Sequence, residues 1–210
     1  MRIALFGPGR IGAALIPSLE QEGHTVTVLT REDYGDLCLE DLDEREANVR
    51  KAVEKVACDV ALILVGRFLR GPFDELIGEM TDANFLSPMA LGLAVSEKNP
   101  QAHIIYFLDG RIDWELGGVP ADTRAYLSSK KDLGRHIAGA ARDLTTGRVN
   151  AIALGPVLAP PDKAHSEKAG TCLTPRPTLA DVAAAVKFLI NCPSVTGQIL
   201  YIDGGQHLLG

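Results

Sequence analysis

The sequence predicts a single doubly wound α/β domain, with a mainly parallel sheet and helices on both of its faces. Short apolar runs suited to buried parallel strands alternate with longer segments of helical periodicity. A glycine-rich turn joins the first apolar run to the first helical segment. The 210 residues are 46% hydrophobic, which suits one core, and no linker or internal repeat divides them. We therefore expect one domain spanning residues 1–210.

Composition and charge exclude several classes of function. The formal net charge of −6 disfavours nonspecific binding to nucleic acid or to an anionic membrane. No apolar run approaches the roughly 20 residues of a membrane span, and the N-terminus lacks a signal-peptide pattern. Cysteines and histidines are scattered, so no metal site is predicted. We expect a cytoplasmic protein that acts on a small molecule.

The chain opens with a strand, a glycine turn and a helix. Residues 3–6 form a short apolar run, and residues 13–19 carry helical apolar spacing. Between them, Gly7, Gly9 and Gly12 form the pattern G-x-G-x-x-G. In this context the pattern is typical of a Rossmann-like dinucleotide site, where glycines permit a tight turn, close approach to a pyrophosphate and close helix–strand packing.

The residues after the second expected strand, 26–29, bear on the choice of cofactor. An acidic side chain there would bind the adenosine ribose and repel a 2′-phosphate, but the chain has Thr30 and Arg31. A guanidinium suits a phosphate, so NADPH is favoured over NADH. Glu32 and Asp33 follow directly, and a later strand end would reverse this preference.

Strands and helices alternate through the middle of the chain. A short third strand is expected at residues 37–39, a helix at residues 44–56 and a buried strand at residues 59–65. The buried strand ends at Val65 and Gly66, where the backbone can pass close to a cofactor.

The next stretch, residues 72–98, is helical overall and contains Asn84. An asparagine within a helix is usually an ordinary polar position, but one that faces the sheet could hold a water or a backbone carbonyl near a reactive centre. An apolar run at residues 104–108 follows and delivers Asp109 at its carboxyl end.

A helical segment then carries Tyr126 and Lys130 four residues apart, on one face. A positive charge favours phenolate and lowers the pKa of a tyrosine from about 10, so the pair suits proton donation near neutral pH. The spacing also occurs by chance on amphipathic helices, so its weight depends on the nucleotide-type turn elsewhere in the chain.

The last third of the chain completes the sheet. Strands are expected at residues 149–153 and 198–202, with a helix at residues 179–190 between them. Residues 158–177 are rich in proline and have no periodicity, which suits a substrate lid at the ligand edge of the sheet; simple disorder is the alternative.

Together these pieces resemble the short-chain dehydrogenase/reductase family across essentially the whole chain. The matching motifs are the glycine turn, Tyr126-x-x-x-Lys130, the run 149–157, and the closing segments 196–198 and 203–205. The resemblance implies that Tyr126 protonates the substrate, that Lys130 binds the nicotinamide ribose and lowers the tyrosine pKa, and that Asn84 holds a water. It also implies the following cofactor contacts: Gly7, Gly9, Arg10, Ile11, Gly12, Val65, Gly66, Gly155, Pro156 and Val157.

The sequence departs from the family pattern at three places. Asp109 stands where members usually have a serine, residues 64–67 replace an Asn-Asn-Ala-Gly motif, and the glycine turn is one residue shorter. An aspartate at that position resembles the pteridine and dihydromonapterin reductases, which reduce dihydropterins with NADPH. Its carboxylate can accept hydrogen bonds from an amino-pyrimidine edge. Asp113 fits the spacing of that subgroup better but follows the expected strand end.

The resemblance predicts an NADPH-dependent reductase that transfers hydride to a C=N or C=O bond, with a dihydropterin as the leading substrate. One alternative is a carbonyl reductase for another small substrate, in which Asp109 merely replaces the serine. Another is a non-catalytic nucleotide-binding sensor on the same fold. The resemblance also implies a homodimer or homotetramer through the Tyr126 helix and the helix before it, where small residues would permit close packing: Ala138, Gly139, Ala140 and Ala141.

Overall fold

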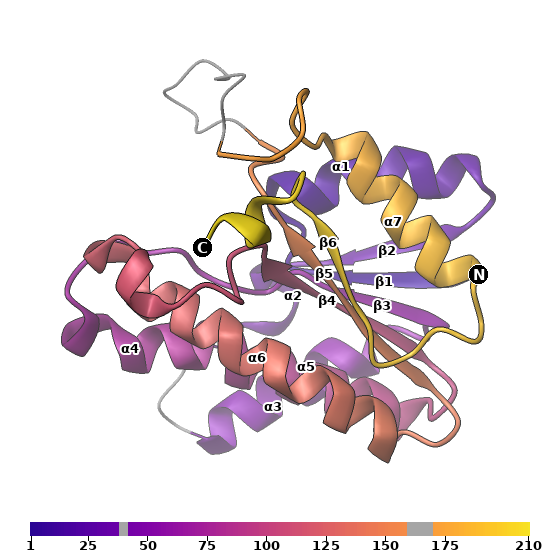
Figure 1. Cartoon of the computed structure of the whole chain (residues 1–210). Helices are drawn as coiled ribbons and strands as arrows, with labels where there is room; N and C mark the ends of the chain where they lie inside the picture. The colour runs from indigo at the N-terminus through magenta and orange to yellow at the C-terminus, as the bar shows by residue number, and fades with distance from the viewer. Residues whose placement is uncertain (38–41, 159–169) are drawn as a thin grey trace.

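The computed structural model describes residues 1–37, 42–158 and 170–210. Within them, six parallel strands form one sheet in the order β2-β1-β3-β4-β5-β6 (Figure 1). The predicted doubly wound α/β fold is confirmed, and every strand pair described is parallel. The strands are β1 (Arg2–Phe6), β2 (Thr25–Leu29), β3 (Val60–Ile63), β4 (His103–Asp109), β5 (Arg148–Leu154) and β6 (Ile199–Ile202).

The apolar runs in the sequence become the central strands because these are covered on both faces. β3 is buried at every residue, and β4 is buried at every residue except the last, Asp109. The edge strands β2 and β6 have one neighbour each and are more exposed.

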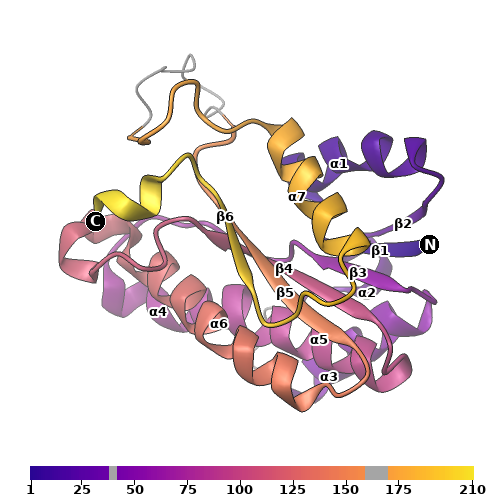
Figure 2. The ribbon, with the colours of Figure 1, turned by 45° about the vertical axis from the view of Figure 1, so that its right-hand side comes forward.

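Two layers of helices cover the sheet (Figure 2). Helices α1 and α7 pack their leucines and valines on one face, while α3, α5 and α6 pack on the other, and α4 lies along α6. None of the helices described here combines the length and apolarity that crossing a bilayer requires. The bounds are α1 (Gly9–Gln21), α3 (Leu42–Glu54), α4 (Phe73–Thr81), α5 (Ser87–Lys98), α6 (Arg124–Asp143) and α7 (Leu179–Asn191).

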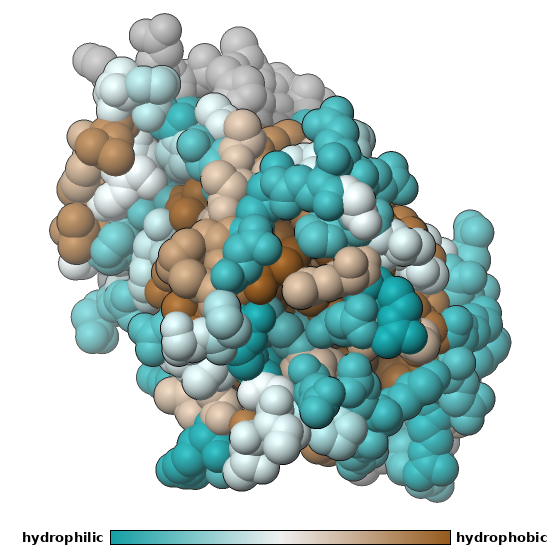
Figure 3. All heavy atoms as spheres, turned by 90° about the vertical axis from the view of Figure 1, so that its right-hand side faces the viewer, coloured by the Kyte–Doolittle hydropathy of each residue, from teal (hydrophilic) through white to brown (hydrophobic). Residues whose placement is uncertain are grey.

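The side of the molecule near β2 and α7 is mostly polar, with smaller apolar areas (Figure 3). Roughly half of the surface of an ordinary folded protein is apolar, so this mixture is typical of a face that contacts solvent. The largest exposed side chain of α7, Phe188, is 47% exposed.

The predicted helix over residues 72–98 is interrupted by a π-helical turn. α4 ends at Thr81, the π-helical turn spans Asp82–Leu86, and α5 begins at Ser87. A π-helical turn widens the helix locally and is often found at functional sites. Asn84 lies within this turn and is fully buried.

A short helix, α2 (Arg31–Tyr34), follows β2 directly. Thr30 and Asp33 form a capping box at its start, with the Thr30 N–H donating to Asp33 Oδ2 at 2.8 Å. β2 therefore ends at Leu29, as the preference for NADPH requires. The expected strand at residues 37–39 falls largely on residues 38–41, and most of the expected lid on residues 159–169; both segments lie outside the described residues.

The direction of sheet growth reverses between β1 and β3. Ligands of open α/β sheets bind outside the carboxyl ends of the strands at this switch point. The glycine turn follows β1 there, and Val65 and Gly66 follow β3. The fold thus brings the expected cofactor-binding segments to one edge.

Candidate active site

The turn after β1 has the geometry of a dinucleotide-binding turn. Gly7 and Gly9 have positive φ angles of 64° and 50°, which other residues rarely adopt. A Cβ on Gly12 would lie 2.9 Å from Leu5 Cδ2, so glycine allows α1 to pack closely on β1. A Cβ on Gly7 would lie 3.1 Å from the Cα of Val65, so the turn also approaches the end of β3 closely.

A cavity of about 370 Å³ opens between the glycine turn, the start of α2 and the segment after β3. We call it the nucleotide cavity, because its size suits a bound small molecule and it lies at the switch point. Arg10 is exposed on α1 and does not line it, and Gly12 is buried beneath the turn. Six of the predicted cofactor-binding residues line it: Gly7, Gly9, Thr30, Arg31, Val65 and Gly66.

A second cavity of about 200 Å³, the reaction cavity, adjoins the first. The two share Leu64, Gly66 and Arg67 in their linings, so they lie on either side of one common wall. The structure thus brings together residues that the sequence separates widely. The reaction cavity is lined by Tyr126, Lys130, Asn84, Ile11 and Phe68, among others.

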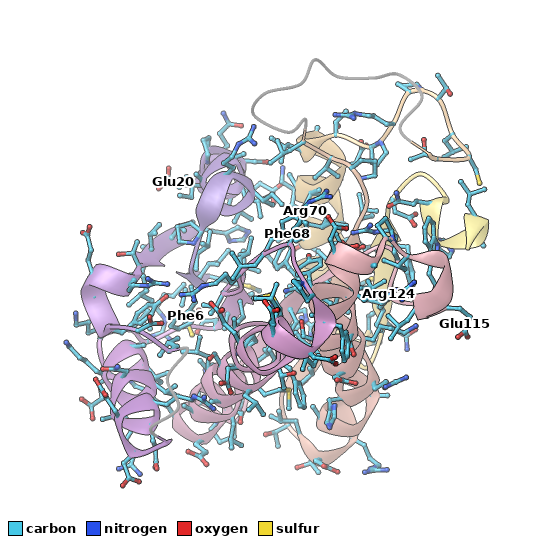
Figure 4. All side chains as sticks on the ribbon, turned by 90° about the vertical axis from the view of Figure 1, so that its left-hand side faces the viewer. Phe6, Glu20, Phe68, Arg70, Glu115 and Arg124 are labelled. Carbon is cyan, nitrogen blue, oxygen red and sulfur yellow. The ribbon has the colours of Figure 1, made fainter. Side chains whose placement is uncertain are left out.

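Tyr126 stands in the first turn of α6 and is partly covered by Phe68. The two rings pack edge to face, with centroids 4.8 Å apart and planes at 88°. Phe68 and Arg70 come from the segment between β3 and α4 (Figure 4), where the Arg70 guanidinium lies 5.5 Å from the Phe68 ring centroid. The position of Phe68 just beyond β3 predicted that it lies in the crevice outside the strand ends, where it could touch a ligand or cap the surface; the loop conformation places it beside Tyr126.

The electrostatics around Tyr126 differ from the expectation. Burial, and then the nearby Asp109 carboxylate, raise the pKa of Tyr126 above its ordinary value, while Arg111 lowers it. The predicted lowering by Lys130 is not found, because the Lys130 ammonium is directed at β4, where Nζ donates to the Phe107 carbonyl oxygen at 3.1 Å. Helical spacing places Tyr126 and Lys130 on one face but does not fix where the ammonium points.

Lys130 is itself unusual. Its side chain is buried, and burial lowers the pKa of its ammonium to about 8, although Asp109 raises it. A lysine with such a pKa is partly neutral at mildly alkaline pH and can exchange a proton there. It closely approaches Gly66, on which a Cβ would lie 3.3 Å from Lys130 Nζ.

Hydrogen bonds of Asn84 link the segment after β3 to the π-helical turn. Its Oδ1 accepts the Arg67 backbone N–H at 3.0 Å, and its Nδ2 donates to the Arg67 carbonyl oxygen at 2.9 Å and to that of Met80 at 3.2 Å. Asn84 lines the same cavity as Tyr126 and Lys130. The contacts are with backbone groups, so Asn84 shapes the cavity wall that Gly66 and Arg67 form.

Asp109 ends β4 and pairs with Arg111, a residue that sequence reasoning missed. The backbone N–H and Nε of Arg111 donate to Asp109 Oδ1, and Nη2 donates to Oδ2, all at 2.9 Å. Asp113 is exposed and accepts the Tyr201 hydroxyl at 2.5 Å. Of the two aspartates weighed for this position, Asp109 is the one whose charge acts on Tyr126.

The segment after β5 is placed differently from the expectation. Val157 is buried in the core beneath α7, and neither Gly155 nor Pro156 lines the two cavities described above. A Cβ on Gly155 would lie 2.5 Å from the Cα of Asp203, so this glycine permits close packing against the end of β6. Leu154 is the residue of this segment that reaches the reaction cavity.

Groups of acidic, His or Cys side chains that could hold a metal ion were sought over the described ranges, and none is present there. The three cysteines that the structure describes, Cys58, Cys172 and Cys192, are free thiols.

Comparisons with known proteins agree with this architecture. No family model matches the chain. Carbonyl reductase family member 4 from Danio rerio is 26% identical over 238 aligned residues, covering 98% of this chain and 97% of that protein. The structure of 4-hydroxyisoleucine dehydrogenase complexed with NADH has a TM-score of 0.79 and 20% identity, covering 99% of this chain and 98% of that one. FolM alternative dihydrofolate reductase 1 from Brucella canis, complexed with NADP, has a TM-score of 0.76 and 20% identity, covering 99% and 94%.

The structural matches show a shared fold at low identity, and the similarity to the Danio rerio protein extends over nearly the full length of both chains. The strand order and the placement of Tyr126 and Lys130 beside a nucleotide-type cavity agree with this likeness. The chain therefore resembles the short-chain dehydrogenase/reductase family, in fold through the solved structures and in sequence through the Danio rerio carbonyl reductase family protein.

Proposed function

We propose that the chain is an NADPH-dependent reductase that transfers hydride to a C=N or C=O bond of a small substrate. The observation that carries this proposal is the wall that the two cavities share. Tyr126 and Lys130 line the reaction cavity, and the glycine turn lines the nucleotide cavity, with Gly66 common to both. A substrate in the reaction cavity would therefore lie between the hydroxyl of Tyr126 and a bound nucleotide.

Tyr126 and Lys130, which both line the reaction cavity, have chemical roles in this proposal. Bound NADPH supplies the hydride. The Tyr126 hydroxyl donates a proton to the substrate atom that gains electrons. Lys130 is close enough to the shared wall at Gly66 to hold a ribose hydroxyl, and its pKa of about 8 allows it to return a proton to Tyr126 after the reaction.

Asp109 and Phe68 favour a flat, nitrogen-rich substrate such as a dihydropterin. A carboxylate accepts hydrogen bonds from an amino-pyrimidine edge, and an aromatic ring packs against a planar heterocycle. Structural likeness to a FolM dihydrofolate reductase is consistent with this substrate class. Because Arg111 occupies both oxygens of Asp109, the carboxylate would act as an acceptor that orients the substrate, while Tyr126 donates the proton.

A carbonyl reductase for another small substrate is the second candidate. It is favoured by the curated relative from Danio rerio, which is named as a member of a carbonyl reductase family. In this case Asp109 would stay paired with Arg111 beside the cavity, whose lining includes neither residue, and no amino-pyrimidine edge would be needed. A non-catalytic nucleotide sensor gives no reason for Tyr126 and Lys130 to line the same cavity.

Fluorescence titration of the purified protein with NADPH and with NADH, followed by addition of dihydrobiopterin, tests the proposal. We expect NADPH to bind and to be oxidised only when the pterin is present. If NADPH binds but is not consumed, dihydropterin is rejected as the substrate, and a panel of carbonyl compounds should be tested next. Failure of both nucleotides to bind would overturn the proposal as a whole.

The variant Tyr126→Phe separates binding from proton donation. It removes one hydroxyl from the reaction cavity, so kcat should fall by roughly 100- to 10,000-fold while the Kd for NADPH stays the same. Tyr201→Phe is the matched control, because Tyr201 donates to Asp113 and does not line either cavity. Equal activity of the Tyr126→Phe variant and the native protein would contradict the mechanism.

A further inference from the structure

Three charged side chains from two segments, those after β2 and after β3, meet in the nucleotide cavity. Arg31 begins α2, Asp36 follows it, and Arg67 follows β3; all three line the cavity. Arg31 Nη1 lies 3.8 Å from Asp36 Oδ2, and Arg67 Nη2 lies 3.9 Å from the same oxygen. One carboxylate oxygen is therefore set between two guanidinium groups.

The backbone places this carboxylate. Gly35 has a φ of 92°, a conformation that turns the chain back into the cavity and that other residues rarely adopt. Asn48 Nδ2 donates to the Asp36 carbonyl oxygen at 2.8 Å. A Cβ on Gly35 would lie 2.9 Å from Asn48 Oδ1, so this turn also requires a glycine. Main-chain contacts therefore hold Asp36 at the cavity, in addition to its ion pairs with Arg31 and Arg67.

The ion pairs in this cluster are long and exposed to solvent. The side chains of Arg31, Asp36 and Arg67 are 63%, 34% and 30% exposed, so water screens their attraction. A phosphate monoester could make shorter, bidentate hydrogen bonds with both guanidiniums. The carboxylate of Asp36 opposes such a ligand, because it repels a phosphate that enters between the same two cations.

We propose that Asp36 sets the cofactor preference of this chain, by offsetting the positive charge with which Arg31 and Arg67 would bind the 2′-phosphate of NADPH. The proposal rests on the proposed function, because it concerns the adenosine end of the same cofactor. It adds Arg67 as a second phosphate-binding residue. It also makes Asp36 the residue that reduces the preference for NADPH over NADH. Arg67 is also paired with Glu79, whose negative charge further weakens the attraction of Arg67 for a phosphate.

The variant Asp36→Asn tests this inference by nucleotide binding alone, without a substrate. Fluorescence titration should show NADPH binding roughly five- to tenfold more tightly than to the native protein, while the Kd for NADH changes less than about twofold. Arg67→Gln should weaken NADPH binding by a similar factor and leave NADH binding unchanged. Glu32→Gln is the control, because it removes one negative charge from exposed α2 outside the cavity lining and should leave both Kd values unchanged.

Other outcomes have distinct meanings. If Asp36→Asn weakens NADH binding and leaves NADPH binding alone, Asp36 is a ligand of the ribose hydroxyls and the inference is wrong. An unchanged ratio of the two Kd values would also overturn it, with the proposed function intact. If the native protein binds neither nucleotide, the proposed function and this inference fail together.

Discussion

Lys130 is a residue of the candidate site whose ionisation couples the site to stability near neutral and alkaline pH. Burial lowers the pKa of its ammonium to about 8, from 10.5 in an unfolded chain. The folded protein therefore disfavours the protonated form of Lys130. Below pH 8 this lysine is protonated in both states, and burying its ammonium lowers the free energy of unfolding by its full amount. As the pH rises from 8 towards 10.5, the unfolded chain still binds the proton and the folded chain does not, so stability should increase.

The variant Lys130→Met removes this dependence. Between pH 7 and pH 9.5 the free energy of unfolding of the native protein should rise by about 2 kcal/mol relative to the variant. Urea unfolding at the two pH values measures the difference. Lys51→Met is the control, since Lys51 is exposed on α3, and its curve should stay parallel to that of the native protein. Parallel curves for Lys130→Met as well would show that Lys130 titrates normally.

Residues whose roles depend on local spacing could be predicted from the sequence, and residues placed by loops could not. Gly7, Gly9 and Gly12 were found because their spacing along the chain determines the turn. Arg111 was missed because it meets its partner, Asp109, only after the segment following β4 has folded. Phe68 was expected in the crevice after β3, but its contact with Tyr126 depends on how that loop folds. An arginine two positions after an aspartate at a strand end is a weak indication that the two side chains form an ion pair across a turn.

At the scale of elements, the π-helical turn and the segment after β3 form one unit. Asn84 is the link, because its amide satisfies both backbone groups of Arg67. Asn84→Ala would leave those groups without their partners, which costs about 1–3 kcal/mol for buried polar groups. We expect urea unfolding to show a loss of this size, together with weaker NADPH binding, because Gly66 and Arg67 line both cavities.

Asn99→Ala provides the matched control for this link. Asn99 Nδ2 donates to the Cys58 carbonyl oxygen at 2.9 Å, so the change also removes one hydrogen bond from an asparagine to the main chain. This bond lies at the amino end of the strands, far from the glycine turn. The variant should lose stability but keep its affinity for NADPH. A loss of affinity in both variants would show that global destabilisation, and not the link, governs binding.

Elements with long periodic patterns were predicted correctly, and their interruptions were not. The helix over residues 72–98 was found from its apolar spacing, but the π-helical turn inside it follows from the need to bury Asn84 against Arg67, which is a tertiary contact. In the same way, α2 was not predicted, because four residues are too few for periodicity. Its capping box, Thr30 with Asp33, was the available signal.

At the scale of the whole molecule, the strand order follows from alternation of the elements, because parallel strands joined by helices build outward from the first strand on both sides. Association between chains does not follow in this way. Of the four small residues expected at a helical interface, Ala141 is buried in the core of its own chain, whereas Ala138 is exposed. No atom lies within 4 Å of a Cβ built on Gly139, so this position opens outward.

The helical layer of α5 and α6 is the surface on which we expect a second copy to pack. Leu93 on α5 is 61% exposed, and a cavity of about 270 Å³ lies between the two helices, lined mainly by apolar side chains. Burying a leucine from solvent contributes roughly 1.5–3 kcal/mol, and a two-fold axis would repeat this contribution in the partner. The native protein should therefore elute as a dimer or tetramer of a 22.4 kDa chain.

Leu93→Glu should dissociate this assembly, because symmetry would place two buried carboxylates at one interface. Light scattering after gel filtration should give the 22.4 kDa mass of one chain, and NADPH should still bind, since Leu93 lines neither the nucleotide cavity nor the reaction cavity. Phe188→Glu replaces an exposed apolar residue on the opposite helical layer and should keep a mass of at least two chains. A monomeric native protein would show that this layer contacts solvent and that each chain binds the nucleotide alone.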